Sequence, residues 1–247
     1  MSIYKIHPIV MGSKVFDKTM MTYQYGYGQT YSIPIYSWYI EGSGVKILVD
    51  TGEMSPSRSA AAEKAIGGKI YTFEEGLARW DIGPEDIDIV IHTHLHNDHC
   101  ENDEKCLNAQ IYVHEAEIER IHNPHPLDFR YMEDYILEVE KQGQLKTISG
   151  DKEIVKDIVA IHTPAHTEGG MSIQIQTSSG KAIITGFCCI MENFNPPPAI
   201  RGMDMEVIPP GTHVNVYEAY DIMIRVKEMA DVLIPFHEPS FASVDTI

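Results

Sequence analysis

The chain has 247 residues, of which 43% are hydrophobic and 22% are charged, and its formal net charge is −17. This length and composition are typical of a globular α/β domain with a substantial core. The acidic balance disfavours a nucleic-acid partner, because binding to phosphates needs clustered lysine and arginine. No apolar run approaches the about 18 residues of a membrane span, and no signal segment opens the sequence, so we expect a cytoplasmic protein with no membrane partner.

The four cysteines are Cys100, Cys106, Cys188 and Cys189. Two of them are adjacent, which is an awkward arrangement for a disulfide framework. Free or metal-bound thiols in a reducing compartment are the better interpretation.

Short hydrophobic runs bounded by glycine, proline or polar residues predict strands. In chain order they cover 3–10, 35–42, 45–51, 87–91, 111–113, 154–161, 172–176, 182–185 and 232–234. Helical patterns cover 57–66, 73–80, 115–121, 131–141 and 214–229. The glycine-rich stretch 11–31 predicts an irregular segment, either a cover over the core or a flexible apolar wall of a pocket.

Strand runs before residue 115 are mirrored by strand runs after residue 150, with helices following each set. This pattern predicts two packed β-sheets flanked by helices. We therefore treat residues 1–247 as a single α/β domain, with a helical excursion at about 115–150.

The most informative stretch is His94-Leu95-His96-Asn97-Asp98-His99, which directly follows the buried strand at 87–91. Three imidazoles and one carboxylate within six residues are hard to explain by packing. Histidine is the commonest metal ligand in proteins, and a carboxylate completes a mixed ligand set. The stretch predicts a transition-metal site, with zinc as the first choice and iron or manganese as alternatives.

The motif His94-x-His96-x-Asp98-His99, a later His166 in Thr-Pro-Ala-His and a late His237 resemble the metallo-β-lactamase superfamily, whose fold is an αββα sandwich. Asp50-Thr51-Gly52 is similar to that family's early strand-end motif. Within the superfamily the chain most resembles the N-acyl-homoserine lactonase-like branch.

The resemblance implies that His94, His96 and His166 hold a first metal, and that Asp98, His99 and His237 hold a second. It implies a metal-bound hydroxide as the nucleophile, since a bound metal lowers the pKa of water from about 15.7 towards 7. Asp98 would then pass a proton to the leaving oxygen. The spacing alone indicates metal binding; these roles come from the resemblance.

Two positions depart from the lactonase-like pattern. Where those families have Gly-Asp, with an aspartate that bridges two metals, this chain reads Gly186-Phe187-Cys188-Cys189. Their tyrosine near the substrate carbonyl falls at Ile190. Either Cys188 is a thiolate ligand in place of the aspartate, or the second site is weak or absent, or the chain is an inactive or specialised relative. As a plain core residue, Cys188 would be a small buried side chain.

We expect a metal-dependent hydrolase of a small ester or lactone whose other portion is apolar or aromatic. Hydrolysis of an aryl ester or ether, a thioester or a β-lactam is a rival reading, and a metal-stabilised non-catalytic subunit of an active homologue is another. Whether the chain forms homo- or hetero-oligomers stays open. Asp50 is either a turn former or a carboxylate that orients a metal-binding histidine.

Overall fold

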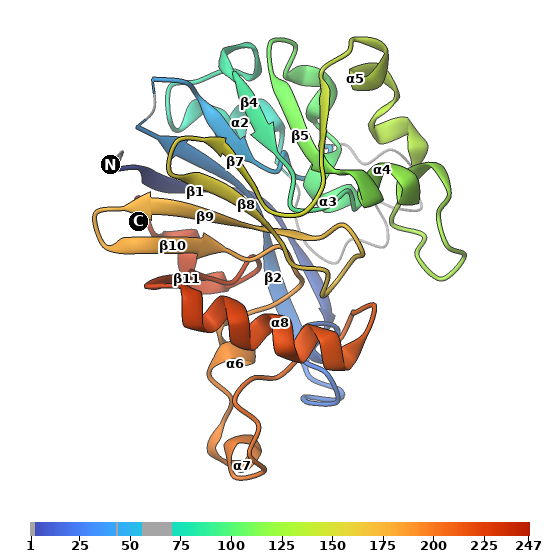
Figure 1. Ribbon diagram of the computed structural model, residues 1–247, viewed down its shortest axis with the longest axis vertical. Helices are drawn as coiled ribbons and strands as arrows, with labels where there is room; N and C mark the ends of the chain where they lie inside the picture. The colour runs from blue at the N-terminus through green and yellow to red at the C-terminus, as the bar shows by residue number, and fades with distance from the viewer. Residues whose placement is uncertain (1–2, 43, 56–70) are drawn as a thin grey trace.

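The structure is a computed structural model that describes residues 3–42, 44–55 and 71–247. Its strands form two sheets (Figure 1). The first sheet has the order β1 (Lys5–Asp17), β2 (Thr30–Glu41), β3 (Ile47–Val49), β4 (Ile89–Ile91), β5 (Gln110–His114) and β6 (Leu145–Ile148). The second has the order β11 (Val232–Ile234), β10 (Gly180–Ile184), β9 (Met171–Thr177), β8 (Ile158–His162) and β7 (Lys152–Val155).

Some of the helices cover the outer faces of the two sheets. The described helices are α2 (Phe73–Ala78), α3 (Asn97–Cys100), α4 (Glu115–His122), α5 (Leu137–Lys141), α6 (Met191–Phe194), α7 (Pro198–Arg201) and α8 (Val216–Met229). Figure 1 shows α8 running along the sheet of β9, β10 and β11, with α2, α4 and α5 on the side of β4 and β5, whereas α7 extends away from the sheets. No helix in the described ranges is long and apolar enough to cross a membrane.

Three apolar clusters separate the four layers, and strand β3 shows how the sequence builds them. Ile47 and Val49 point into the cluster between the sheets, where they pack with residues of the second sheet such as Ile173. Leu48, between them, points the other way, into the cluster under α2 with Phe73. Side chains alternate across a strand, so a continuous apolar run is buried on both faces. The result is the predicted αββα sandwich.

The third cluster lies beneath α8. Asn215 caps this helix by accepting from the backbone N–H groups of Tyr217 and Glu218. Its buried face, which includes Met223 and Val226, packs on Ile183 of β10. The helix therefore covers the second sheet much as the sequence pattern at 214–229 predicts.

Several elements differ from their predictions. The stretch 11–31 is not irregular throughout, because β1 continues to Asp17 and β2 begins at Thr30, with a register shift between Val10 and Gly12. The run 154–161 forms two strands, β7 and β8, instead of one. Residues 145–148, inside the predicted excursion, form β6 and pair with β5. The expected helix at 57–66 lies outside the described residues.

The parallel strands position the functional loops. Strands β3, β4 and β5 run parallel, so their carboxyl ends meet at one edge of the first sheet. The loop with Asp50 follows β3, and the loop with His94 and His96 follows β4. The second sheet contributes the loop after β8, with His166, and the segment after β11, with His237. The histidines predicted from distant parts of the chain thus arrive at one place.

Candidate metal centre

Two groups of side chains could each hold a metal ion among the described residues. His94, His96 and His166 each offer a ring nitrogen, and these nitrogens lie within 4.8 Å of one another. Asp98, His99 and His237 form the second group by the same measure. The first group is buried throughout, and in the second only Asp98 is part-exposed. These groups contain the same residues as the two triads that the resemblance implies.

In the first group, hydrogen bonds fix which ring nitrogen faces the centre. His96 Nε2 lies 3.1 Å from Asp128 Oδ2, and a carboxylate can only accept, so His96 presents Nδ1 inward. His166 Nδ1 donates to the carbonyl oxygen of Thr212 at 2.8 Å and presents Nε2. The two inward nitrogens lie 3.1 Å apart. Proteins commonly orient metal-binding imidazoles in this way, through a hydrogen bond at the ring nitrogen that faces away from the metal.

The third ring gives the clearest test of whether an ion fits. His94 Nδ1 lies 3.0 Å from Thr93 Oγ1, whose own hydrogen goes to Asp50 Oδ2 at 2.6 Å. His94 Nε2 is buried and has no hydrogen-bond partner. A buried polar atom without a partner is costly. A metal ion bound by these three nitrogens would satisfy it, so the donor set fits a borderline divalent ion such as zinc.

The second group is oriented in the same way. His99 Nδ1 lies 2.7 Å from Asp50 Oδ2, and His237 Nδ1 donates to the carbonyl oxygen of Pro34 at 2.9 Å. Each ring therefore presents Nε2 towards Asp98, whose Oδ1 is 3.8 Å from His99 Nε2. Asp50 thus contacts a ring of the predicted metal site, which favours its reading as an orienting carboxylate.

Asp50 is also strained into place. It adopts a left-handed backbone conformation with φ of 59°, which aspartate tolerates better than most side chains. Its Oδ1 accepts from Thr93 N at 2.8 Å and faces His92 Nδ1 at 3.2 Å. His92 Nε2 in turn lies 2.7 Å from Asp103 Oδ2. A fully buried network of hydrogen bonds therefore fixes the loop after β4, which carries His94 and His96. Asp103 belongs to this network, and it was not singled out from the sequence.

The charges at the centre favour neutral imidazoles and an ionised carboxylate. Burial lowers the pKa of His96 and of His237 to about 4, which leaves both rings neutral and able to bind a metal. Burial by itself would raise the pKa of Asp98, but the charges of Lys14 and of the nearby histidines hold that pKa well below its usual value. Metal ligands need these deprotonated forms.

Cys188 lines the same pocket but belongs to neither of the two triads. Its Sγ contacts Met21 Sδ at 3.6 Å. Burial raises the pKa of the Cys188 thiol to about 12, so in this arrangement it is a thiol. Cys189 lies on the other side, in the cluster under α8, with its Sγ 3.1 Å from Thr185 Oγ1. Of the two cysteines, only Cys188 reaches the pocket.

Glu117 of α4 joins the two loops of the first triad. Its Oε2 accepts from the N–H of Leu95 at 2.9 Å, between the two loop histidines, and its Oε1 accepts from the N–H of Gly169 at 3.0 Å. Tyr131 donates to Oε2 at 2.8 Å, and its ring packs against His96. A Cβ on Gly169 would lie 2.7 Å from Glu117 Cγ, so this close approach requires glycine.

The centre opens into a cavity of about 490 Å³. Lys14 Nζ stands in it, 2.6 Å from Glu53 Oε2 and 3.6 Å from Asp98 Oδ2. The side chains of Arg130 and Asp128 form an ion pair at its edge. Most of the cavity's lining surface is apolar. The full lining is Lys14, Phe16, Met20, Met21, Ile33, Glu53, His96, Asn97, Asp98, His99, Phe129, Arg130, Met132, Tyr135, His166, Cys188, Thr212 and His237.

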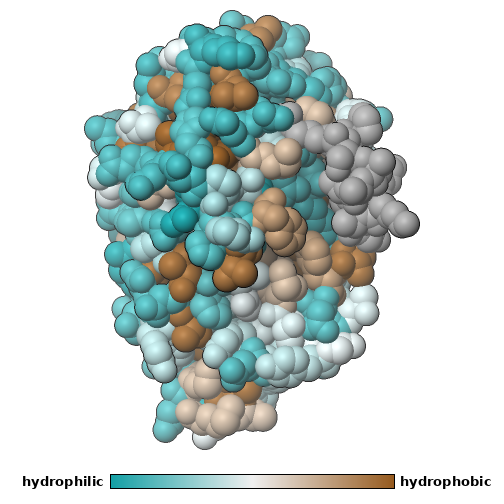
Figure 2. Space-filling view, turned by 90° about the vertical axis from the view of Figure 1, so that its right-hand side faces the viewer, coloured by the Kyte–Doolittle hydropathy of each residue, from teal (hydrophilic) through white to brown (hydrophobic). Residues whose placement is uncertain are grey.

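Hydrophobic side chains also reach the surface. On the side of the molecule in Figure 2, they gather near the middle of the face, between hydrophilic areas. Phe129 is 85% exposed and Met132 is 43% exposed, and both line the cavity. The cavity therefore continues into exposed apolar side chains.

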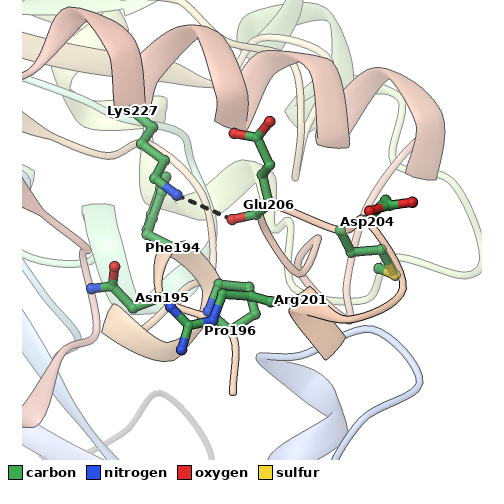
Figure 3. A pocket seen from close by; sticks show the side chains of 8 residues that line it. Phe194, Asn195, Pro196, Arg201, Asp204, Glu206 and Lys227 are labelled. Atoms are coloured by element: carbon green, nitrogen blue, oxygen red, sulfur yellow. Dashed lines mark hydrogen bonds between the residues drawn. The ribbon is translucent and has the colours of Figure 1, made fainter. Parts of the chain in front are cut away.

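A second hollow, of about 320 Å³, lies between α8 and the segment 194–206 (Figure 3). The ammonium of Lys227 donates to the backbone oxygen of Glu206 there at 3.1 Å. Its lining mixes Arg201 with Asp204, and contains no histidine or cysteine among the described residues. It lacks the ligand chemistry of the first cavity.

Comparison with known families shows the superfamily of the chain. The model of the metallo-beta-lactamase superfamily matches residues 32–186. The chain belongs to this superfamily. An N-acyl homoserine lactonase of a Bacillus species is 28% identical over 225 residues, which cover 84% of this chain and 85% of the relative. The N-acyl homoserine lactonase AiiB of Rhizobium rhizogenes is 22% identical over 190 residues, 69% of each chain.

Solved structures of the superfamily share the fold. A quorum-quenching N-acyl homoserine lactone lactonase superposes with a TM-score of 0.79 at 24% identity, covering 100% of this chain and 99% of the other. AidC, a dizinc quorum-quenching lactonase, superposes with a TM-score of 0.70 at 14% identity, covering 100% and 92%. The superfamily membership and the lactonase relatives in sequence make the protein a metal-dependent, lactonase-like hydrolase, and its two triads fit a divalent metal ion.

Proposed function

We propose that the protein hydrolyses a small ester or lactone with an apolar portion, and that its metal is zinc. The observation that supports this most directly is the set of five imidazoles, each oriented by a hydrogen bond, beside a largely apolar cavity. His94, His96 and His166 would hold one ion, and Asp98, His99 and His237 would hold a second. Bound zinc supplies a nucleophilic water at neutral pH and polarises the carbonyl.

Asp98 is the residue that we propose moves the proton. Its low pKa leaves the carboxylate ionised at rest, and it lines the cavity. As water adds to the carbonyl carbon, the carboxylate accepts a proton from it and passes that proton to the alkoxide oxygen when the C–O bond breaks. The products are a carboxylate and an alcohol, which remain one molecule when the substrate is a lactone.

The apolar part of the substrate would lie against the wall formed by Phe16, Met20, Met21 and Ile33. These side chains line the cavity, and all come from β1, β2 and the turn between them. Methionine adapts its shape to irregular apolar ligands. The relatives are N-acyl homoserine lactonases, which supports a lactone as the cyclic ester.

A substrate panel tests the proposal. The zinc-loaded protein would be assayed with N-acyl homoserine lactones, γ-butyrolactone, an aryl ester, an acyl thioester and a β-lactam. We expect the highest kcat/KM on a lactone, its loss after chelation and its return with zinc. His96→Ala should abolish turnover and His213→Ala, at the part-buried turn after Gly211, should not. Preference for the aryl ester, thioester or β-lactam would replace the substrate class, and full metal loading without turnover on any member would indicate a non-catalytic subunit.

A further inference from the structure

Arg130 is held at the mouth of the metal centre by contacts at both of its ends. It lies between α4 and α5, and its backbone oxygen accepts from the N–H of Asn97 at 3.3 Å, inside the metal-binding motif. Its guanidinium lines the cavity together with His166 and Cys188. A long side chain anchored in this way has few conformations left to lose when it binds a ligand.

Asp128 fixes the plane of the guanidinium. Arg130 Nε lies 2.6 Å from Asp128 Oδ1, and Nη2 lies 2.9 Å from Oδ2, which is the two-point geometry of a strong arginine–carboxylate pair. The same Oδ2 faces His96 Nε2 at 3.1 Å. Asp128 therefore sets the positions of the guanidinium and of a proposed metal ligand relative to each other.

The remaining nitrogen of Arg130 points at the first triad. Nη1 lies 3.5 Å from His166 Nε2, a long distance for a hydrogen bond. That histidine nitrogen is one of the three that converge on the proposed ion. When an ion takes its lone pair, Nη1 loses this acceptor and its N–H groups face the cavity next to the ion.

We propose that Arg130 Nη1 donates a hydrogen bond to the carbonyl oxygen of the substrate, and that this bond strengthens as negative charge develops on that oxygen. The inference rests on the proposed function and deepens it. Ile190 stands where the lactonase-like pattern has a tyrosine, and it is an apolar side chain, 1% exposed, that packs with Met21 and Ile33. Ile190 offers no hydrogen-bond donor, and Arg130 supplies one instead. Arg130 transfers no proton; it stabilises charge at a fixed position.

The chain offers a matched control. Arg120 has the same exposed side-chain fraction as Arg130, 28%, and is likewise paired with a carboxylate, that of Glu168. It lies on α4 and does not line the cavity. Arg130→Met and Arg120→Met thus remove the same group from side chains with the same exposed fraction, inside and outside the site.

The test measures kcat and KM on the best lactone of the panel, the zinc content, and the affinity for 4-hydroxybutyrate by calorimetry. Loss of one such donor costs about 10²- to 10³-fold in kcat. We expect that loss for Arg130→Met at unchanged zinc content, with at least tenfold weaker 4-hydroxybutyrate binding and partial recovery of kcat by millimolar guanidinium. Arg120→Met should match the wild type in every measurement.

The outcomes separate the two proposals. If Arg130→Met keeps kcat and 4-hydroxybutyrate affinity within threefold of the wild type, Arg130 is not the donor. If Arg130→Met loses zinc or folds poorly, the deciding variant is Arg130→Lys, which keeps the positive charge but lacks the planar guanidinium. Full kcat of Arg130→Lys with intact zinc overturns the inference, and a large loss of kcat supports it. A wild type that hydrolyses nothing overturns the proposed function, while its Arg130-dependent binding of 4-hydroxybutyrate still tests the contact.

Discussion

Asp50→Asn isolates the contribution of the carboxylate beneath the metal centre. The wild-type Oδ2 accepts from Thr93 Oγ1 at 2.6 Å and from His99 Nδ1 at 2.7 Å, while Oδ1 accepts from Thr93 N at 2.8 Å and faces His92 Nδ1 at 3.2 Å. An amide has only one oxygen. Whichever way it is turned, its NH₂ group faces two donors, and two hydrogen bonds to a buried charge are lost.

The magnitude follows from these contacts. A hydrogen bond to a charged group contributes about 1.5–3 kcal/mol, so losing two costs about 3–6 kcal/mol. That is a large part of the about 5–15 kcal/mol by which a domain is stable. Where the amide nitrogen faces His99 Nδ1, the ring loses the partner that orients it, and affinity for the second ion should also fall about 10- to 100-fold.

Urea denaturation and competition with a chromophoric chelator measure the two effects. Asp86→Asn is the control, because the Asp86 carboxylate accepts from a backbone N–H of Gly83 on the surface, away from the cavity. The reasoning is refuted if Asp50→Asn keeps its unfolding free energy within about 1 kcal/mol of the wild type and its zinc affinity within twofold.

Three further predictions use the same preparations. Cys188→Ser tests the thiolate hypothesis: a ligand role predicts lower zinc stoichiometry or a rate loss of orders of magnitude, and unchanged values would make Cys188 a pocket-lining thiol only. Glu117→Gln should weaken zinc binding about 10- to 100-fold, since one of the two loops loses its carboxylate partner, whereas the exposed Glu119→Gln should not; equal affinities would contradict the positioning role. Burial lowers the pKa of His92, but Asp103 and Asp50 outweigh burial and raise that pKa to about 10. The charged imidazole therefore contributes fully to stability below about pH 6.5, and this contribution is lost as pH rises through about 10. Urea midpoints that match those of His92→Gln across this range would exclude the contribution.

The sequence predicts the metal centre better than its surroundings because the ligands are close in the chain. His94, His96, Asp98 and His99 follow a buried β-branched strand, so their joint position at a strand end needs no knowledge of the rest of the fold. Strands β3, β4, β5, β9, β10 and β11 were predicted for the same local reason, since each is a short apolar run between turn residues.

The elements that were mispredicted depend on their neighbours. The glycines and tyrosines of 11–31 suggest an irregular segment, yet β1 and β2 pair over most of their length because each supplies the other's backbone hydrogen bonds. Strand β6 pairs with β5 at the edge of the sheet, and half of its residues are exposed. It contains no apolar run from which a strand could be predicted. Propensity is overridden by tertiary pairing in both places.

The charged residues of the site were not predicted from the sequence, for a different reason. Lys14, Glu117 and Arg130 are single charges in ordinary contexts, and most such charges are solvated. Only the folded structure shows that Glu117 is 1% exposed and joins two loops. One sequence signal was available: Glu117 falls in the first turn of a predicted helix, where an acid is common, but nothing there indicates burial.

The ligands of the first triad come from both halves of the sandwich, with His94 and His96 following a strand of the first sheet and His166 following a strand of the second. An ion bound there adds a direct link between the two halves, beside their apolar contacts and hydrogen bonds such as that from Met171 N–H to the backbone oxygen of Thr93. Folding is then linked to metal supply: at a free zinc concentration a thousandfold above Kd, binding adds about 4 kcal/mol to stability. Zinc depletion would enlarge the unfolded fraction by about a thousandfold, so the abundance of intact protein should rise and fall with the zinc available to the cell.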